Sequence, residues 1–266
     1  MQTVPAGSYL LGSDVGPPSQ RPAHRVAVER FLIDETEVTN AAFAEYLNAL
    51  ELKVQEPFEA GELTTRQVGS ETVPLLLEGR QGSGLYPLIA LDDDEARIGY
   101  AEGRFRPTPG YEDHPVAETT WAGARAYCLW RGARLPSEAE WEAAARGLGT
   151  RSYPWGEALP DDARVFVSGR SGVTGAVGLR PAGRSPFGLL DMSGSLAEWT
   201  SSLARPYPYE ATDGREDPTL AGERVTRGGD YIFDSEPEQL TVTHRDGFSN
   251  APGRGHRHIG FRCARS

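Results

Sequence analysis

The chain has 266 residues, of which 38% are hydrophobic and 9% aromatic, so it can bury a core as one large domain or two small ones. Its formal net charge of −11 argues against nonspecific binding of nucleic acid, and no run approaches the roughly 18 apolar residues that a membrane span needs. The 31 glycines and 20 prolines predict many turns and little regular secondary structure. The first residues lack the basic and apolar parts of a secretory signal, so we expect a cytoplasmic protein.

The amino-terminal part predicts a strand followed by a helix. Residues 25–34 alternate apolar and polar positions, which is typical of one half-buried strand. Residues 39–50 place apolar side chains at helical spacing, and Thr39 is suited to cap the helix. Residues 51–113 mix short apolar runs with an acidic cluster at 92–95. We interpret them as an inserted subdomain of short strands and loops, with the acidic cluster as a solvated turn.

Two further helices are predicted in the middle of the chain. The first begins at Thr120 and ends at Gly132. The second begins with a capping box formed by Ser137 and Glu140 and ends at Gly147. Its inward-facing residues are Trp141, Ala144 and Ala145. From residue 148 onward we expect loops and short strands.

The chain contains two cysteines, Cys128 and Cys263. Two thiols 135 positions apart do not form a zinc cluster. From their positions alone they are either a pair that joins distant segments or two independent core residues.

Residues 191–199, DMSGSLAEW, place an aspartate and a glutamate seven positions apart around a glycine and two serines. Few of these residues suit ordinary core packing. The segment is therefore a candidate for a metal-binding loop, a turn, or part of a catalytic pocket.

Seven sequence pieces resemble, in this order, the formylglycine-generating enzyme (sulfatase-modifying factor) family. They occupy residues 4–14, 23–47, 114–147, 153–156, 177–200, 224–231 and 258–265, and include YPWG, RVTRGGDY and HIGFRCAR. The resemblance implies an α+β, C-type-lectin-like fold that is rich in loops, with few helices and short antiparallel strands. It also implies one domain over residues 1–266, with 51–113 inserted.

The family contains copper-dependent oxidases, iron-dependent sulfur-transfer enzymes, a pyoverdine-maturation branch and binding proteins. The resemblance implies that copper enzymes hold Cu(I) through two cysteines between the RGG and GFR motifs. The corresponding residues here, 230–259, contain no cysteine. Because soft thiolates select Cu(I), we expect no formylglycine-generating activity and no catalytic residue of that type.

The resemblance also implies a structural calcium in residues 191–198. Its ligands would be Asp191, the carbonyls of Gly194 and Leu196, and Glu198, a set of hard oxygens that suits calcium. The alternative is a capped turn whose two acids pair with arginines. A second calcium site of the family would fall at 165–175, where we expect none because that stretch has no acid.

Two residues of this segment depart from the family motif GNVWEWT. Ser195 replaces an asparagine and Ala197 replaces a tryptophan, which indicates a reshaped or wider pocket. The resemblance further implies that Cys128 and Cys263 are adjacent, as a disulfide or as packed thiols.

Residues 230–259 line the ligand-facing groove that the resemblance implies. We therefore expect a protein or small-molecule ligand to contact a polar and aromatic set in this segment, namely Asp230, Tyr231, Phe233, His244, Arg245, Arg254, His256 and His258. The runner-up is an oxidoreductase that holds iron through His244, His256 and His258 beside Asp246. The simplest alternative is a solvated polar lining in which Arg245 makes structural ion pairs.

Overall fold

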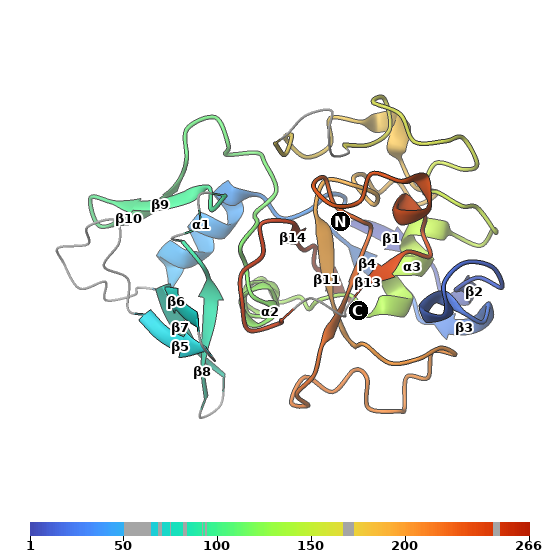
Figure 1. The fold of residues 1–266 in the computed structure, drawn as a ribbon, viewed down its shortest axis with the longest axis horizontal. Helices are drawn as coiled ribbons and strands as arrows, with labels where there is room; N and C mark the ends of the chain where they lie inside the picture. Colours follow the sequence, from blue (N-terminus) through green and yellow to red (C-terminus); the bar gives the residue numbers. More distant parts are fainter. Residues whose placement is uncertain are drawn as a thin grey trace.

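In the computed structural model, the described residues form three α-helices, short strands and long connecting loops (Figure 1). It describes residues 1–50, 65–68, 71–74, 76–81, 84–91, 93, 95–166, 173–246 and 251–266. The acidic residues 92 and 94, residues 247–250 of the expected ligand-binding segment, and residues 167–172 of the second calcium segment lie outside this description.

The central element is a four-stranded sheet in the order β13-β12-β11-β14. Its strands are β11 (Ala197–Leu203), β12 (Arg224–Arg227), β13 (Arg245–Asp246) and β14 (Ile259–Gly260). β11 runs antiparallel to β12 and parallel to β14. This arrangement places the end of the DMSGSLAEW segment beside the HIGFR motif, because Ala197 pairs with Ile259 and Glu198 with Gly260.

A second sheet joins the two ends of the chain. It has the order β1-β4-β15, with β1 at Gln2–Val4, β4 at Phe31–Ile33 and β15 at Ala264–Arg265. A separate hairpin pairs β2 (Gly7–Leu11) with β3 (His24–Val28). The prediction of one strand over 25–34 is therefore wrong, because the chain leaves β3 after Val28 and enters another sheet at Phe31.

The three predicted helices are confirmed. α1 (Asn40–Ala49) is capped by Thr39, and α2 (Trp121–Trp130) by Thr120, each of whose hydroxyls accepts a backbone N–H. α3 (Glu138–Arg146) has the predicted capping box and ends at Gly147. Short 3₁₀ turns lie at Pro18–Gln20, Pro181–Gly183 and Pro237–Leu240.

The described parts of residues 51–113 are mainly three antiparallel hairpins on one side of the molecule (Figure 1). They are formed by β5 (Thr65–Val68) with β6 (Glu71–Pro74), β7 (Leu76–Gln81) with β8 (Gly84–Ile89), and β9 (Ile98–Ala101) with β10 (Arg104–Pro107). Each of these strands is at most six residues long.

The buried apolar side chains form two large clusters. One lies around α1 and α2 and includes Phe43, Tyr127 and Phe261, whose rings contact one another. The other packs α3 against the amino-terminal strands through Trp141 and Tyr9. No helix in the described part of the chain has the length and apolar character of a membrane span.

Candidate functional site

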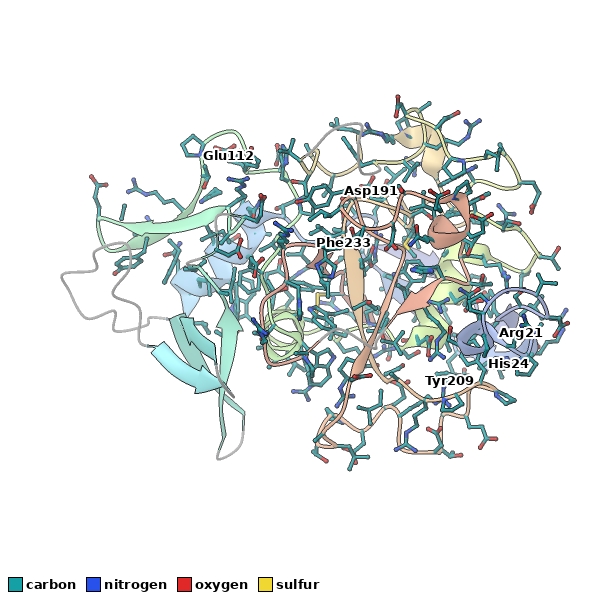
Figure 2. The ribbon with its side chains drawn as sticks, viewed as in Figure 1. Arg21, His24, Glu112, Asp191, Tyr209 and Phe233 are labelled. Atoms are coloured by element: carbon teal, nitrogen blue, oxygen red, sulfur yellow. A yellow bond between two sulfur atoms is a disulfide. The ribbon has the colours of Figure 1, made fainter. Side chains whose placement is uncertain are left out.

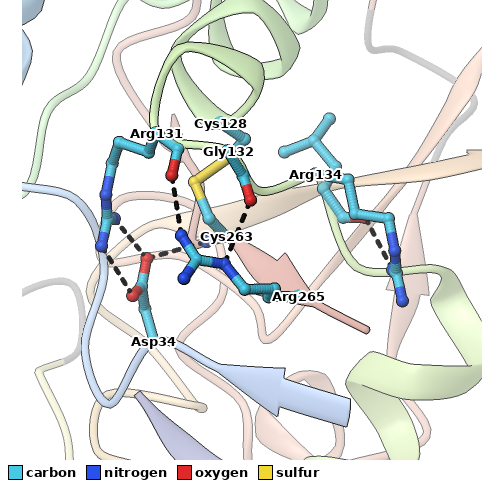
Figure 3. The surroundings of a disulfide bond; sticks show 8 residues. Asp34, Cys128, Arg131, Gly132, Arg134, Cys263 and Arg265 are labelled. Carbon is cyan, nitrogen blue, oxygen red and sulfur yellow. Dashed lines mark hydrogen bonds and ion pairs between the residues drawn. A yellow bond between two sulfur atoms is a disulfide. The ribbon is translucent and has the colours of Figure 1, made fainter.

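The structure joins Cys128 of α2 and Cys263 next to β15 in a disulfide, with their Cα atoms 5.5 Å apart (Figure 3). Both residues are fully buried. Asp34 reinforces the junction, since its carboxylate pairs with Arg131 at 2.7 Å and accepts the backbone N–H of Cys263 at 3.1 Å. The pair therefore fixes the end of α2 to the carboxyl-terminal strand, and no described cysteine is free.

Arg245 lies in the interior rather than on a ligand-facing surface. Its guanidinium donates from Nη2 to Glu138 Oε2 at 2.9 Å and from Nη1 to the Ser19 carbonyl at 2.8 Å. Glu138 is fully buried. We therefore correct the assignment of Arg245 as a ligand contact: it makes the structural ion pair that the sequence had left open as the alternative.

The Arg245 pair belongs to a larger buried network. Arg227, itself fully buried, donates to Glu138 at 3.1 Å and pairs with Glu142. Arg146 donates to the other oxygen of Glu142 at 3.0 Å. The two glutamates lie one turn apart on α3 and receive three arginines, so each buried carboxylate has buried guanidinium partners. Such networks are structural, because removing one member leaves its partners unpaired in a medium of low dielectric.

The DMSGSLAEW loop needs unusual backbone conformations. Asp191 and Ser195 have positive φ angles of 57° and 60°, and Gly194 has 67°. A Cβ atom on Gly194 would lie 2.2 Å from the carbonyl oxygen of Phe166, so glycine is required there on two counts. The loop is therefore a tightly shaped turn under the start of β11.

Glu198 is bound to an arginine. Arg262 donates from Nε and Nη2 to the two carboxylate oxygens at 2.7 Å each, and the indole N–H of Trp141 donates to Oε2 at 2.9 Å. The same guanidinium donates to the carbonyls of Glu35 and Leu190 at 3.0 and 2.9 Å. In this structure Glu198 therefore pairs with arginine, as the turn hypothesis expected.

The buried carboxyl group of Glu37 is not among the predicted site residues. It accepts the Ser195 hydroxyl at 2.9 Å and the Leu196 backbone N–H at 3.0 Å. Burial, followed by the charges of Glu198 and Asp191, raises the pKa of Glu37 well above its ordinary value. The substitution of serine for asparagine at 195 could have pointed to it, because the hydroxyl supplies one of its hydrogen bonds.

Asp191 faces the same region with its own partner. Its Oδ2 accepts the Gly178 backbone N–H at 2.6 Å, and burial raises its pKa. Three buried or largely buried carboxylates, Glu37, Asp191 and Glu198, thus lie around the buried guanidinium of Arg262, and Arg180 is a second cation close to Asp191. This leaves an excess of negative charge that a proton or a cation would balance.

Two of the expected ligand contacts in 230–259 are buried. Asp230 caps the following turn by accepting the backbone N–H groups of Ile232 and Phe233 at 2.6 and 2.7 Å. Tyr231 is 3% exposed and packs beside Leu196, and burial raises its pKa to about 12. Both residues are therefore placed to shape this region rather than to present a side chain to a ligand.

Other expected contacts form a surface around Phe233, which is 57% exposed and labelled in Figure 2. The ring of His258 meets it edge to face with centroids 5.0 Å apart, and Arg257 lies 6.0 Å from it. We call this surface the aromatic–cationic face and define it by Phe233, Arg254, His256, Arg257 and His258, of which the two arginines are exposed and the histidines half-buried.

The three histidines lie near one another but are not arranged as metal ligands: the His256 and His258 rings pack with centroids 5.5 Å apart, and His244 and His258 line one small cavity. His256 contacts the Ala251 carbonyl at 3.0 Å and packs against Trp199, and burial lowers its pKa. His244 instead faces Asp234 at 3.8 Å. Among the described residues, no group of three or more His, Cys, Asp or Glu side chains is arranged to hold a metal ion. The hypothesis of an iron centre on His244, His256 and His258 is therefore not supported by this arrangement.

Ala197, which replaces the family's tryptophan, lines a small cavity of about 10 Å³. Its walls include Asp230, Asp234, His244 and His258. A space of this size holds roughly one water molecule. The space beside Ala197 is thus too small for an organic ligand.

Comparison with protein families matches residues 1–266 to the sulfatase-modifying factor enzyme 1-like domain. The formylglycine-generating enzyme of Streptomyces coelicolor is 31% identical, over 98% of this chain and 87% of that protein. Hercynine oxygenase of Mycolicibacterium smegmatis is 34% identical, over 86% of this chain and 53% of that protein. The serine/threonine-protein kinase Pkn1 of Chlamydia trachomatis is 34% identical over 98% of this chain. The chain spans only 37% of that kinase's length.

Two solved structures share the fold at low sequence identity. PvdO from Pseudomonas aeruginosa has a TM-score of 0.63 at 22% identity, over 99% of this chain and 93% of that one. Variable protein 1 of Treponema denticola has the same TM-score at 19% identity, over 100% and 94%. These likenesses confirm the predicted fold class.

Proposed function

The chain belongs to the sulfatase-modifying factor enzyme 1-like family, and from that premise we propose that it is a binding member of the family rather than a formylglycine-generating oxidase. The observation that carries this proposal is that the cysteine thiols are used in a disulfide. Both cysteines of the chain are joined in one buried disulfide, so neither supplies a thiolate. Residues 230–259, where the copper cysteines of the family lie, contain none.

We propose that the aromatic–cationic face recognises an acidic peptide segment. Residues 251–258 carry two arginines and two histidines and no acid, although the whole chain has a net charge of −11. An exposed aromatic ring beside guanidinium groups suits a ligand that carries carboxylates and an apolar side chain. Asp230 holds the backbone of this face by accepting the Phe233 N–H at 2.7 Å.

The first test measures peptide binding by fluorescence anisotropy. We expect a labelled peptide of alternating aspartate and phenylalanine to bind at least about tenfold more tightly than its lysine counterpart, a difference of roughly 1.4 kcal/mol. The substitutions Phe233→Ala and Arg257→Ala should each weaken binding, and added salt should weaken it further. Arg104→Ala, an exposed arginine on β10, is the control and should have no effect. Equal binding of the two peptides would refute this assignment.

The second test concerns catalysis. Incubation with copper, oxygen and a sulfatase-type cysteine peptide should yield no aldehyde, because Cu(I) selects soft thiolates and the chain has none to offer. A copper-dependent aldehyde that disappears in His256→Ala would overturn the binding proposal and reveal an oxidase site.

Calcium in the 191–198 loop belongs to the same proposal. The excess of carboxylates over arginine around Glu37, Asp191 and Glu198 is the reason for this proposal, and the ion would compete with Arg262 for the oxygens of Glu198. Asp191, the carbonyls of Gly194 and Leu196, and Glu198 would hold the ion, which would neutralise this excess and fix the turn. This role is structural, and no catalytic step depends on it.

One observation favours an oxidoreductase as the second candidate. Hercynine oxygenase is 34% identical over 86% of this chain. Stoichiometric iron in protein purified without oxygen, together with oxygen consumption, would support this candidate over binding alone.

A further inference from the structure

A large cavity lies away from the aromatic–cationic face. It has a volume of about 540 Å³, within the roughly 300–1,000 Å³ typical of small-molecule sites. Its walls come from β3, α2, the start of α3, the end of β11 and the loop over 209–218. Figure 2 shows Tyr209, which lines this cavity, well separated from Phe233.

One wall of the cavity is a single stripe of α2. Trp121, Arg125 and Leu129 are spaced four residues apart and all line the cavity, as positions on one helix face do. Trp121 is held in place because its indole N–H donates to the Thr200 carbonyl at 2.8 Å. The stripe thus presents an aromatic surface, a cation and an exposed apolar side chain side by side.

Most other charged groups of this cavity already have partners. Arg134 donates to both oxygens of Glu140 at 2.6 and 2.7 Å. Glu216 accepts the Tyr209 hydroxyl at 2.8 Å and the hydroxyls of Ser201 and Ser202. Glu29 lies exposed at the rim.

Arg125 is the exception. It is half-buried, burial lowers its pKa, and it makes no hydrogen bond or ion pair with any described residue. A second guanidinium, Arg224, stacks 4.1 Å from the Trp121 ring and donates to three carbonyls, of Ser201, Asp217 and Leu220. Burial lowers the pKa of Arg224 to about 10, against the raising effect of Glu216 and Asp217, and Arg125 adds to the lowering.

We propose that this cavity binds a small organic carboxylate, with Arg125 holding the carboxylate and Trp121 and Leu129 contacting an apolar body. A half-buried guanidinium without a partner is satisfied best by a bidentate carboxylate. A single negative charge fits better than a polyanion, because Glu216 and Glu140 also line the cavity. The apolar walls, which include Val26 and Leu135, favour an aromatic or aliphatic body.

Isothermal titration of the full chain with phenylacetate, indole-3-acetate and hexanoate tests this site, with phenylacetamide as the matched neutral probe. We expect at least one carboxylate to bind saturably below about 1 mM, which corresponds to roughly −4.1 kcal/mol. Phenylacetamide should bind at least about tenfold more weakly than phenylacetate if the charge carries recognition.

Variants locate the binding. Arg125→Gln should weaken carboxylate binding at least tenfold, Arg125→Lys less, and Leu129→Glu should abolish it by repulsion. Arg104→Gln and Phe233→Ala are controls that should leave it unchanged, so this site and the aromatic–cationic face can fail separately. No saturable binding by any carboxylate, equal binding of acid and amide, or an unchanged affinity in Arg125→Gln would each overturn the proposal. The comparison of acid and amide uses the unaltered chain, so it decides even if a variant does not fold.

Discussion

Arg227 and Arg125 show two opposite ways of placing a guanidinium away from bulk water. Arg227 is fully buried and pairs with Glu138 and Glu142, which are also fully buried. Arg125 is half-buried on the wall of a 540 Å³ cavity and pairs with no described residue. The first arrangement holds α3 to the central sheet. The second leaves a cation available for a group from outside.

The difference separates architecture from recognition. A buried ion pair adds little net stability over an apolar replacement, but it is costly to break from one side. A half-buried cation without a protein partner has already lost part of its hydration. A ligand carboxylate that pairs with it offsets this desolvation cost. The same residue type therefore has opposite mutational behaviour in the two regions.

The largest expected loss of stability comes from breaking the buried ion-pair network around Arg227. Glu138→Ala leaves Arg227 and Arg245 without their common carboxylate, and we expect it to lower the free energy of unfolding by about 3–5 kcal/mol. Urea denaturation followed by circular dichroism measures this loss. Glu102→Ala is the control, since its ion pair with Arg106 is exposed and should matter by less than about 1 kcal/mol. A loss no greater than the control's would show that the network is not structural.

Local signals made part of this molecule predictable. Thr39, Thr120 and the Ser137–Glu140 box mark helix starts through hydrogen bonds between residues only three positions apart. The family motifs then gave the fold and implied that Cys128 and Cys263 are adjacent.

Contacts between distant segments were not predictable in the same way. Arg245 meets Glu138 across 107 positions, and Glu37 meets Ser195 across 158. The cavity around Arg125 exists only where five separate segments converge. A sequence without an alignment indicates residue types but not which of them face one another.

The second prediction tests whether a cation balances the three carboxylates around Arg262. Calcium should raise the melting temperature and chelator should lower it. A concentration a hundredfold above Kd adds about 2.7 kcal/mol. Asp191→Asn should abolish the calcium response while keeping an oxygen that accepts the Gly178 N–H. Glu198→Ala is less informative, because it also leaves Arg262 unpaired. Identical unfolding curves with calcium and with chelator would show that this loop binds no calcium. Glu198 would then serve only as the partner of Arg262.

The third prediction uses the raised pKa of Glu37. Because its pKa is higher in the folded state than the ordinary 4.5, its stabilising contribution is complete below about pH 4.5 and is lost as pH rises through the folded pKa. Glu37→Gln cannot ionise, yet its side-chain carbonyl can still accept the Leu196 N–H. In chelator, stability of the variant should therefore fall less than that of the wild type between pH 4.5 and neutrality. Parallel pH profiles would contradict this, and Glu102→Gln serves as the exposed control.

The smallest expected change in the free energy of unfolding is opposite in sign to that of Glu138→Ala. It concerns Arg125 in the cavity. Without ligand, Arg125→Gln should change the free energy of unfolding by no more than about 0.5 kcal/mol, and in the stabilising direction, because it removes a partly desolvated charge that pairs with none of the described residues. With phenylacetate present, the wild type should gain stability by mass action and the variant should not. Urea denaturation with and without the carboxylate measures both quantities. A loss of several kcal/mol in the ligand-free variant would mean that Arg125 is structural, like Arg227, and that the contrast between the two regions does not hold.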